Sequence, residues 1–138
     1  MLRDGAVAAL QGSELIIHAG DVGDASILDA LRRIAPVTAV RGNIDFAGPC
    51  AALPETAVVS DTIWVLHNLR DLDLDPGAAG FRMVVSGHTH KAASFEKNGV
   101  LYVNPGSAGP RRFRLPITVA RFDSGVMPWR VEFIELDG

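Results

Sequence analysis

The pattern that most constrains the fold is a strand, a helix and a second strand within residues 14–40. Residues 14–18 have the length and branched side chains of a buried strand, and residues 25–34 carry apolar side chains at helical spacing. Pro36 ends this helix, and residues 37–40 form a second short apolar strand. Because two consecutive strands joined by a helix pair in parallel, this segment predicts an α/β fold.

The remainder of the chain is expected to consist mainly of strands. Seven further apolar segments of strand length are separated by polar residues, Gly or Pro, namely residues 57–59, 63–66, 83–85, 94–96, 100–103, 117–122 and 129–136. The last segment alternates apolar and polar side chains, which is typical of a half-exposed antiparallel strand. We therefore predict a parallel beginning and an antiparallel second half, in one domain over residues 1–138. A two-sheet β-sandwich with flanking helices would bury all of these strands.

The composition excludes several classes of protein. A formal net charge of −3 argues against a general nucleic-acid binder, because such binding requires many Lys and Arg side chains on phosphates. Cys50 is the only cysteine, which excludes an intramolecular disulfide and favours a reducing compartment, so we expect a cytoplasmic protein. No apolar run approaches the roughly 18 residues of a membrane span, so no membrane partner is expected.

Polar side chains follow the predicted buried strands at the point where each strand ends. Because ligands of α/β sheets bind at the carboxyl ends of the strands, these side chains form one candidate site. Carboxylate, carboxamide and imidazole donors together suit Mn, Fe, Co, Ni or Zn. A pair of such ions assists phosphoryl chemistry by holding a nucleophilic water and the oxygens of the reacting phosphate. The candidate ligands are Asp21, Asn43, His67, His88 and His90.

Several short motifs occur in the order Gly20-Asp21, Gly42-Asn43-Ile44-Asp45, His67, Gly87-His88-Thr89-His90 and Asn104-Pro105-Gly106-Ser107, with Pro110-Arg111 following. This order resembles the metallophosphoesterase (calcineurin-like phosphoesterase) superfamily, in particular its small bacterial and archaeal phosphodiesterase branch. The resemblance implies the calcineurin-like phosphoesterase fold. It also implies a metal-dependent phosphoric ester hydrolase that cleaves a small phosphodiester through a metal-bound hydroxide.

The resemblance assigns a role to each candidate ligand. Asp21 would bridge two metal ions, and Asn43, His67 and His88 would complete the second metal site. His90 would ligate the first metal ion. Asn43 and His67 are also expected to be catalytic residues. Mn²⁺ is the expected cofactor, with Fe, Co, Ni or Zn as alternatives.

The resemblance also implies a substrate-binding site. Asn104, Ser107 and Arg111 would lie beside the substrate phosphate, where a guanidinium offers planar, bidentate donors. Ser107 is expected to face the phosphate from a turn rather than act as a nucleophile. The nucleophile-elbow pattern requires glycine two residues before the serine, and Pro105 stands there instead.

Two departures from the family pattern lower the expected activity. Family members begin with a strand ending in Asp-x-His, which supplies two ligands of the first metal, and no such motif precedes Asp21. We therefore expect that the first central strand is missing through a start codon assigned too late, and that one ion binds well and a second weakly. A partner chain, as in a homo-oligomer, would cover the exposed sheet edges. Ile44 stands where many members have a proton-donating His, which favours substrates with good leaving groups.

Two less specific interpretations stand beside this one. The first is a non-catalytic interaction scaffold, because the superfamily contains a retromer scaffold subunit that keeps the fold with a degraded metal site. The ligands after the first motif are all present in this sequence, which argues against that alternative. The second concerns His18, which is interpreted as a packed or hydrogen-bonded side chain outside the site, because its neighbours Ile17 and Ala19 are apolar.

Overall fold

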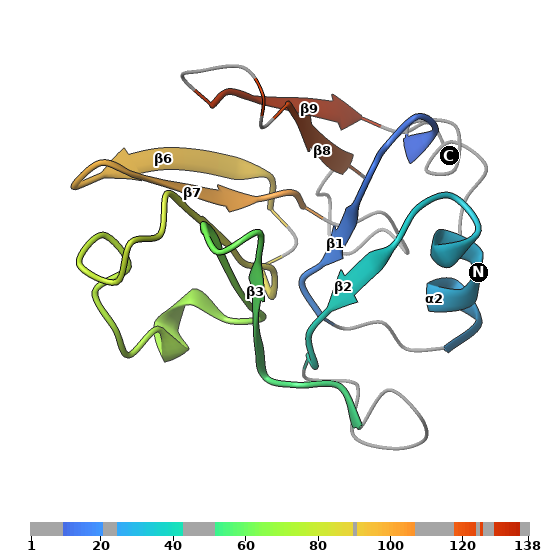
Figure 1. The fold of residues 1–138 in the computed structure, drawn as a ribbon, viewed down its shortest axis with the longest axis horizontal. Coiled ribbons are helices and arrows are strands. Elements are labelled where there is room, and N and C mark those ends of the chain that lie inside the picture. Colours follow the sequence, from blue (N-terminus) through green and yellow to red (C-terminus); the bar gives the residue numbers. More distant parts are fainter. Residues whose placement is uncertain are drawn as a thin grey trace.

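A computed structural model describes residues 10–20, 25–42, 52–89, 91–106, 118–123, 125 and 129–135. Strands predominate in these ranges, and helix α2 lies beside β2 on one flank (Figure 1). The elements are β1 (Ile16–His18), α2 (Ala25–Arg32), β2 (Val37–Ala39), β3 (Thr56–Val59), β4 (Ile63–Leu66), the 3-10 helix η2 (Leu69–Asp71), β5 (Met83–Val85), β6 (Ala93–Lys97), β7 (Val100–Asn104), β8 (Thr118–Phe122) and β9 (Val131–Glu135).

The predicted strand, helix, strand unit is confirmed. β1 and β2 pair in parallel, with Ile16 opposite Val37. Leu31 of α2 packs against Ile16, and Leu28 packs against Val37, so the apolar stripe of the helix covers this small sheet. The helix ends at Arg32, two residues before the predicted end, because the following residues close a tighter turn on the last carbonyls. Neither α2 nor any other helix in the described ranges is long and apolar enough to cross a membrane.

The prediction of an antiparallel second half is wrong at the centre of the main sheet. This sheet has the order β3-β4-β5-β7-β6, and its three middle strands β4, β5 and β7 run parallel. Only β3 and β6 pair antiparallel, each through a hairpin to its neighbour. Residues 67–82 between β4 and β5 are long enough for a parallel crossover. β5 is buried along its whole length, as expected for a central parallel strand.

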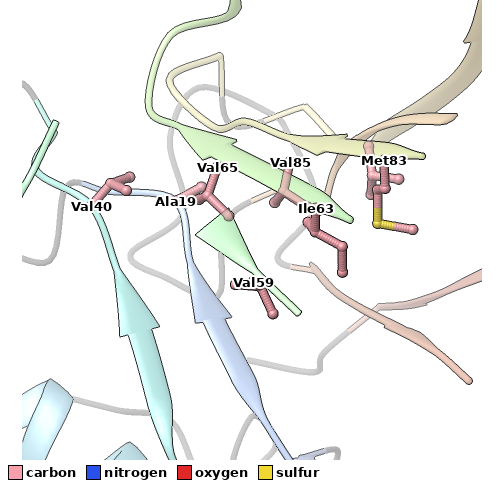
Figure 2. Packing of buried hydrophobic residues seen from close by; sticks show 8 residues of the cluster. Ala19, Val40, Val59, Ile63, Val65, Met83 and Val85 are labelled. Atoms are coloured by element: carbon pink, nitrogen blue, oxygen red, sulfur yellow. The ribbon is translucent and has the colours of Figure 1, made fainter. Parts of the chain in front are cut away.

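The hydrophobic core joins the β1–β2 sheet to one face of the five-stranded sheet. Ala19 and Val40, which directly follow β1 and β2, belong to the same buried cluster as Val65 and Val85 (Figure 2). Phe122 at the end of β8 packs against this cluster, so the β8–β9 hairpin covers the same face. The two small sheets therefore form one layer over the main sheet, and the α/β fold class is confirmed.

A cavity of about 480 Å³ lies between β1 and β8, with apolar side chains of the five-stranded sheet lining it. Among the described residues, β1 pairs only with β2, and β8 pairs only with β9. The N–H of Ile16 and the C=O of His18 point toward the β2 side, so strand alternation turns the N–H and C=O of Ile17 to the opposite edge. Ile17 also lines the cavity, which therefore has an open strand edge as one wall.

Candidate metal centre

Three of the predicted site residues lie in described segments, at one edge of the five-stranded sheet. His67 directly follows β4, His88 lies three residues beyond β5, and Asn104 ends β7. Because β4, β5 and β7 are parallel neighbours, their carboxyl ends share one edge of the sheet. The other predicted site residues lie outside the described residues, as does Ile44: they are Asp21, Asn43, His90, Ser107 and Arg111.

His67 is buried, at 6% exposure, and is oriented by a backbone carbonyl. Its Nδ1 lies 2.7 Å from the carbonyl oxygen of Ala19, the residue after β1. A carbonyl oxygen only accepts, so Nδ1 carries the proton and Nε2 presents a lone pair. Histidines that ligate metals have this arrangement, in which a hydrogen bond to the second ring nitrogen fixes the tautomer and the ring orientation.

His88 presents a second nitrogen at the same point. Its Nδ1 lies 3.3 Å from Nε2 of His67, and the two rings meet edge to face at 85° with centroids 5.2 Å apart. Two nitrogen ligands at 2.0–2.1 Å from one tetrahedral ion would lie about 3.3 Å apart. The imidazole pair therefore fits a divalent transition metal. Within the described ranges the pair acquires no third His, Cys, Asp or Glu that would complete a metal-binding group.

Gly20 allows the loop after β1 to lie against His67 and against Gly42 in the loop after β2. A Cβ on Gly20 would lie 2.5 Å from Nδ1 of His67 and 2.9 Å from the Cα of Gly42, and Gly20 has a φ of +102°. Both the close approach and the backbone conformation require glycine at this position. Asp21 and Asn43 follow these glycines in the sequence. The loops after β1, β2 and β4 therefore converge.

His88 has a strained backbone. Its φ is +71°, and the N–H of Thr89 bonds to the carbonyl oxygen of Gly87 at 2.9 Å, which closes a γ-turn centred on His88. The γ-turn with positive φ is rare, and a non-glycine residue in such a conformation costs on the order of 1–3 kcal/mol. Strain of this kind persists where the surroundings fix the turn, and it is concentrated at functional sites.

Replacing His88 by Gly is expected to give a more stable protein than replacing it by Ala. Ala keeps the Cβ that disfavours positive φ, and glycine removes it, so H88G should exceed H88A in free energy of unfolding by about 1 kcal/mol. Both variants lose the imidazole and should bind Mn²⁺ at least tenfold more weakly than wild type. Urea unfolding and calorimetric Mn²⁺ titration measure the two effects. Equal or greater stability of H88A would contradict the strain.

His18 contributes to the geometry although sequence reasoning kept it outside the site. Its Nδ1 accepts a hydrogen bond from the N–H of Gly20 at 3.2 Å. This contact resembles the turn that Asn or Asp makes with the amide two residues further on. It fixes the turn after β1, where Ala19 offers its carbonyl to His67. A polar acceptor two residues before a Gly-Asp pair is the sequence signal that indicates such a turn.

This chain is similar in sequence to phosphoesterases, and its fold is similar to those of phosphoesterases and Vps29 proteins. The profile of the calcineurin-like phosphoesterase superfamily domain matches residues 2–125. A probable metallophosphoesterase from Methanocaldococcus jannaschii is 33% identical over 68% of this chain, which spans only 53% of the length of that relative. An archaeal phosphodiesterase structure has a TM-score of 0.72 at 19% identity, covering 94% of this chain and 88% of its own. The Zn²⁺ complex of Vps29 from Entamoeba histolytica has a TM-score of 0.69 at 19% identity, and the match covers 99% of this chain and 91% of the Vps29 chain.

Proposed function

The chain belongs to the calcineurin-like phosphoesterase superfamily, and on that premise we propose that it hydrolyses a small phosphodiester with the help of divalent metal ions. One observation carries the proposal. Nε2 of His67 and Nδ1 of His88 lie 3.3 Å apart, and the carbonyl of Ala19 holds His67 in the tautomer that a metal ligand needs. We propose Mn²⁺ as the metal, because the mixed oxygen and nitrogen donor set suits it.

The chain's own residues bind and orient the reacting groups. Divalent ions, when bound, supply Lewis acidity toward the phosphate and a nucleophilic water at neutral pH. We assign His67 and His88 to one ion, together with Asn43 and the bridging Asp21. We assign His90 to the other ion.

The substrate side of the proposed site favours activated esters. Arg111 and Ser107 are assigned to the phosphate, where a guanidinium pairs with two phosphate oxygens at once. Ile44 has no ionisable group and cannot protonate a leaving oxygen. Small phosphodiesters with acidic leaving groups are therefore the proposed substrate class.

A non-catalytic interaction scaffold is the second candidate, and the likeness to Vps29 supports it. The Vps29 from Entamoeba histolytica is a Zn²⁺ complex, so metal binding alone does not separate a hydrolase from a Vps29-like protein. Turnover of substrate is the property that distinguishes the two candidates. The scaffold candidate predicts a metal-binding protein without hydrolysis above background.

Hydrolysis of bis(p-nitrophenyl) phosphate is expected to depend on Mn²⁺. Protein stripped with a chelator and dialysed should have no activity above the buffer blank, because the ions supply the nucleophile and stabilise the phosphate charge. Mn²⁺ should restore the release of p-nitrophenol at least tenfold above the stripped protein, a conservative threshold for metal-ion catalysis. Absorbance at neutral pH follows the product, and His67→Ala purified in parallel controls for contaminating phosphodiesterases. Mn²⁺ binding without turnover would favour the scaffold.

A further inference from the structure

We propose that Asn104 is a positioning residue that clamps the strained turn of His88, and that it acts on the metal centre through His88 rather than through the substrate. The proposal rests on the proposed function in one respect, the use of His88 as a metal ligand. The family resemblance implies a position for Asn104 beside the substrate phosphate. The hydrogen bonds of its side chain point to a different role.

The Asn104 amide spans the His88 turn from one side to the other. Its Nδ2 donates to the carbonyl oxygen of Gly87 at 3.0 Å and to Oγ1 of Thr89 at 3.0 Å. These two acceptors belong to the residues directly before and after His88. The same carbonyl of Gly87 closes the γ-turn by accepting from the N–H of Thr89. One side-chain nitrogen therefore holds both flanks of the strained residue.

The remaining polar atom of Asn104 is also used. Its Oδ1 accepts from the N–H of Gly106 at 2.9 Å. A carboxamide has two N–H donors, and both are committed to the His88 turn. No Nδ2 hydrogen is left for a phosphate oxygen. The N–H of Gly106 is likewise committed, to Oδ1 of Asn104.

Asparagine suits this position because of its donor set. Aspartate would accept from Gly106 but could not donate to Gly87, and serine has a single donor. β7 pairs with β5 through Val103 and Val85, so the end of β7 lies beside the loop that carries His88. The clamp therefore links a central strand to a turn that could not hold its conformation alone. Loosening the clamp should let His88 move away from His67.

The first test uses metal-free protein and reads the distance between the two imidazole rings. Wild type should give a nuclear Overhauser contact between the rings of His67 and His88, whose nitrogens lie 3.3 Å apart. N104A should lose it. N98A is the matched control, because it makes the same side-chain change in the β6–β7 hairpin turn, at the other end of β7, where Asn98 has a φ of +53°. N98A should keep the contact, and a contact retained in N104A would overturn the clamp.

The second test measures Mn²⁺ affinity by calorimetry in a graded series. N104A should weaken binding about tenfold or more, the loss typical of removing a group that orients a ligand. T89V removes one of the two acceptors of the Asn104 amide and should weaken Mn²⁺ binding less than N104A does. T89S keeps the hydroxyl, and N98A does not change the turn at His88. These last two variants should therefore bind Mn²⁺ like wild type. In an H88G background N104A should have no further effect, because its target is gone. Equal affinity of N104A and N98A would overturn the proposal.

The two tests separate failure of this inference from failure of the proposed function. A wild-type protein that binds no Mn²⁺ would refute the proposed metal centre, and the ring contact would still show whether Asn104 holds His88. A wild-type protein that binds Mn²⁺, together with an N104A variant that binds it equally well, would refute only the clamp.

Discussion

Gly20→Ala is expected to destabilise the protein severely. The added methyl group would lie 2.5 Å from Nδ1 of His67 and 2.9 Å from backbone atoms of Gly42, distances that Cβ atoms do not tolerate. Overpacking against a fixed neighbour costs about 1–3 kcal/mol, and the positive φ of +102° adds a backbone penalty of about 1–3 kcal/mol. Urea unfolding should therefore show a loss of about 2–6 kcal/mol in the free energy of unfolding, the sum of these two contributions.

Gly80→Ala is the matched control for this substitution. Gly80 has a φ of +91°, and a Cβ there would meet no described atom within 4 Å. This variant should show the backbone penalty alone, so the difference between the two variants isolates the contact with His67 and Gly42. G20A should also displace His67 from the carbonyl of Ala19 and weaken Mn²⁺ binding, while G80A should not. Equal stabilities of the two variants would show that the loops do not converge as described.

His67→Ala is expected to abolish the metal centre. The variant loses Nε2, and the drop in Mn²⁺ affinity should exceed the 10–100-fold that is typical when only an orienting group is removed, that is, more than about 100-fold. Hydrolysis of bis(p-nitrophenyl) phosphate should fall to the level of chelator-treated protein. The carbonyl of Ala19 also loses its buried partner, which should lower the free energy of unfolding by about 1–3 kcal/mol.

His18→Asn is the control for the loss of an imidazole near the site. The Asn oxygen can accept from the amide two residues further on, so this variant should preserve the turn at Gly20. Its Mn²⁺ affinity and turnover should match those of wild type. An H67A protein that binds Mn²⁺ as tightly as H18N would remove His67 from the metal centre and with it the proposed mechanism.

Part of the fold follows from local patterns in the sequence. The apolar run at residues 14–18, the helical spacing at residues 25–34 and the stop at Pro36 together predict β1, α2 and β2, and the parallel pairing is confirmed. These signals are local because each depends on residues a few positions apart. The parallel direction of β5 relative to β4 and β7 could not be predicted in this way, because a short apolar run has no periodicity that encodes strand direction.

The sequence likewise predicts only part of the candidate site, because only part of it depends on local signals. Polar residues at the carboxyl ends of neighbouring strands gather at one edge of the sheet, which predicts that His67 and His88 lie close together. In the structure, Nε2 of His67 and Nδ1 of His88 lie 3.3 Å apart. Their role as metal ligands stays a prediction. The turn at His88 and the hydrogen bonds of Asn104 could not be predicted, because they depend on contacts between β5 and β7. The contact of His18 with Gly20 is local and could have been recognised.

The cavity between β1 and β8 exposes a strand edge to which another extended chain could add. One of its walls is the unpaired backbone of Ile17, which in the described part of the chain faces no other strand. Any solute that offers extended backbone to this wall and prefers the folded form shifts the folding equilibrium by mass action. A peptide or a second copy of the chain that paired with this wall would therefore raise the melting temperature as its concentration rises.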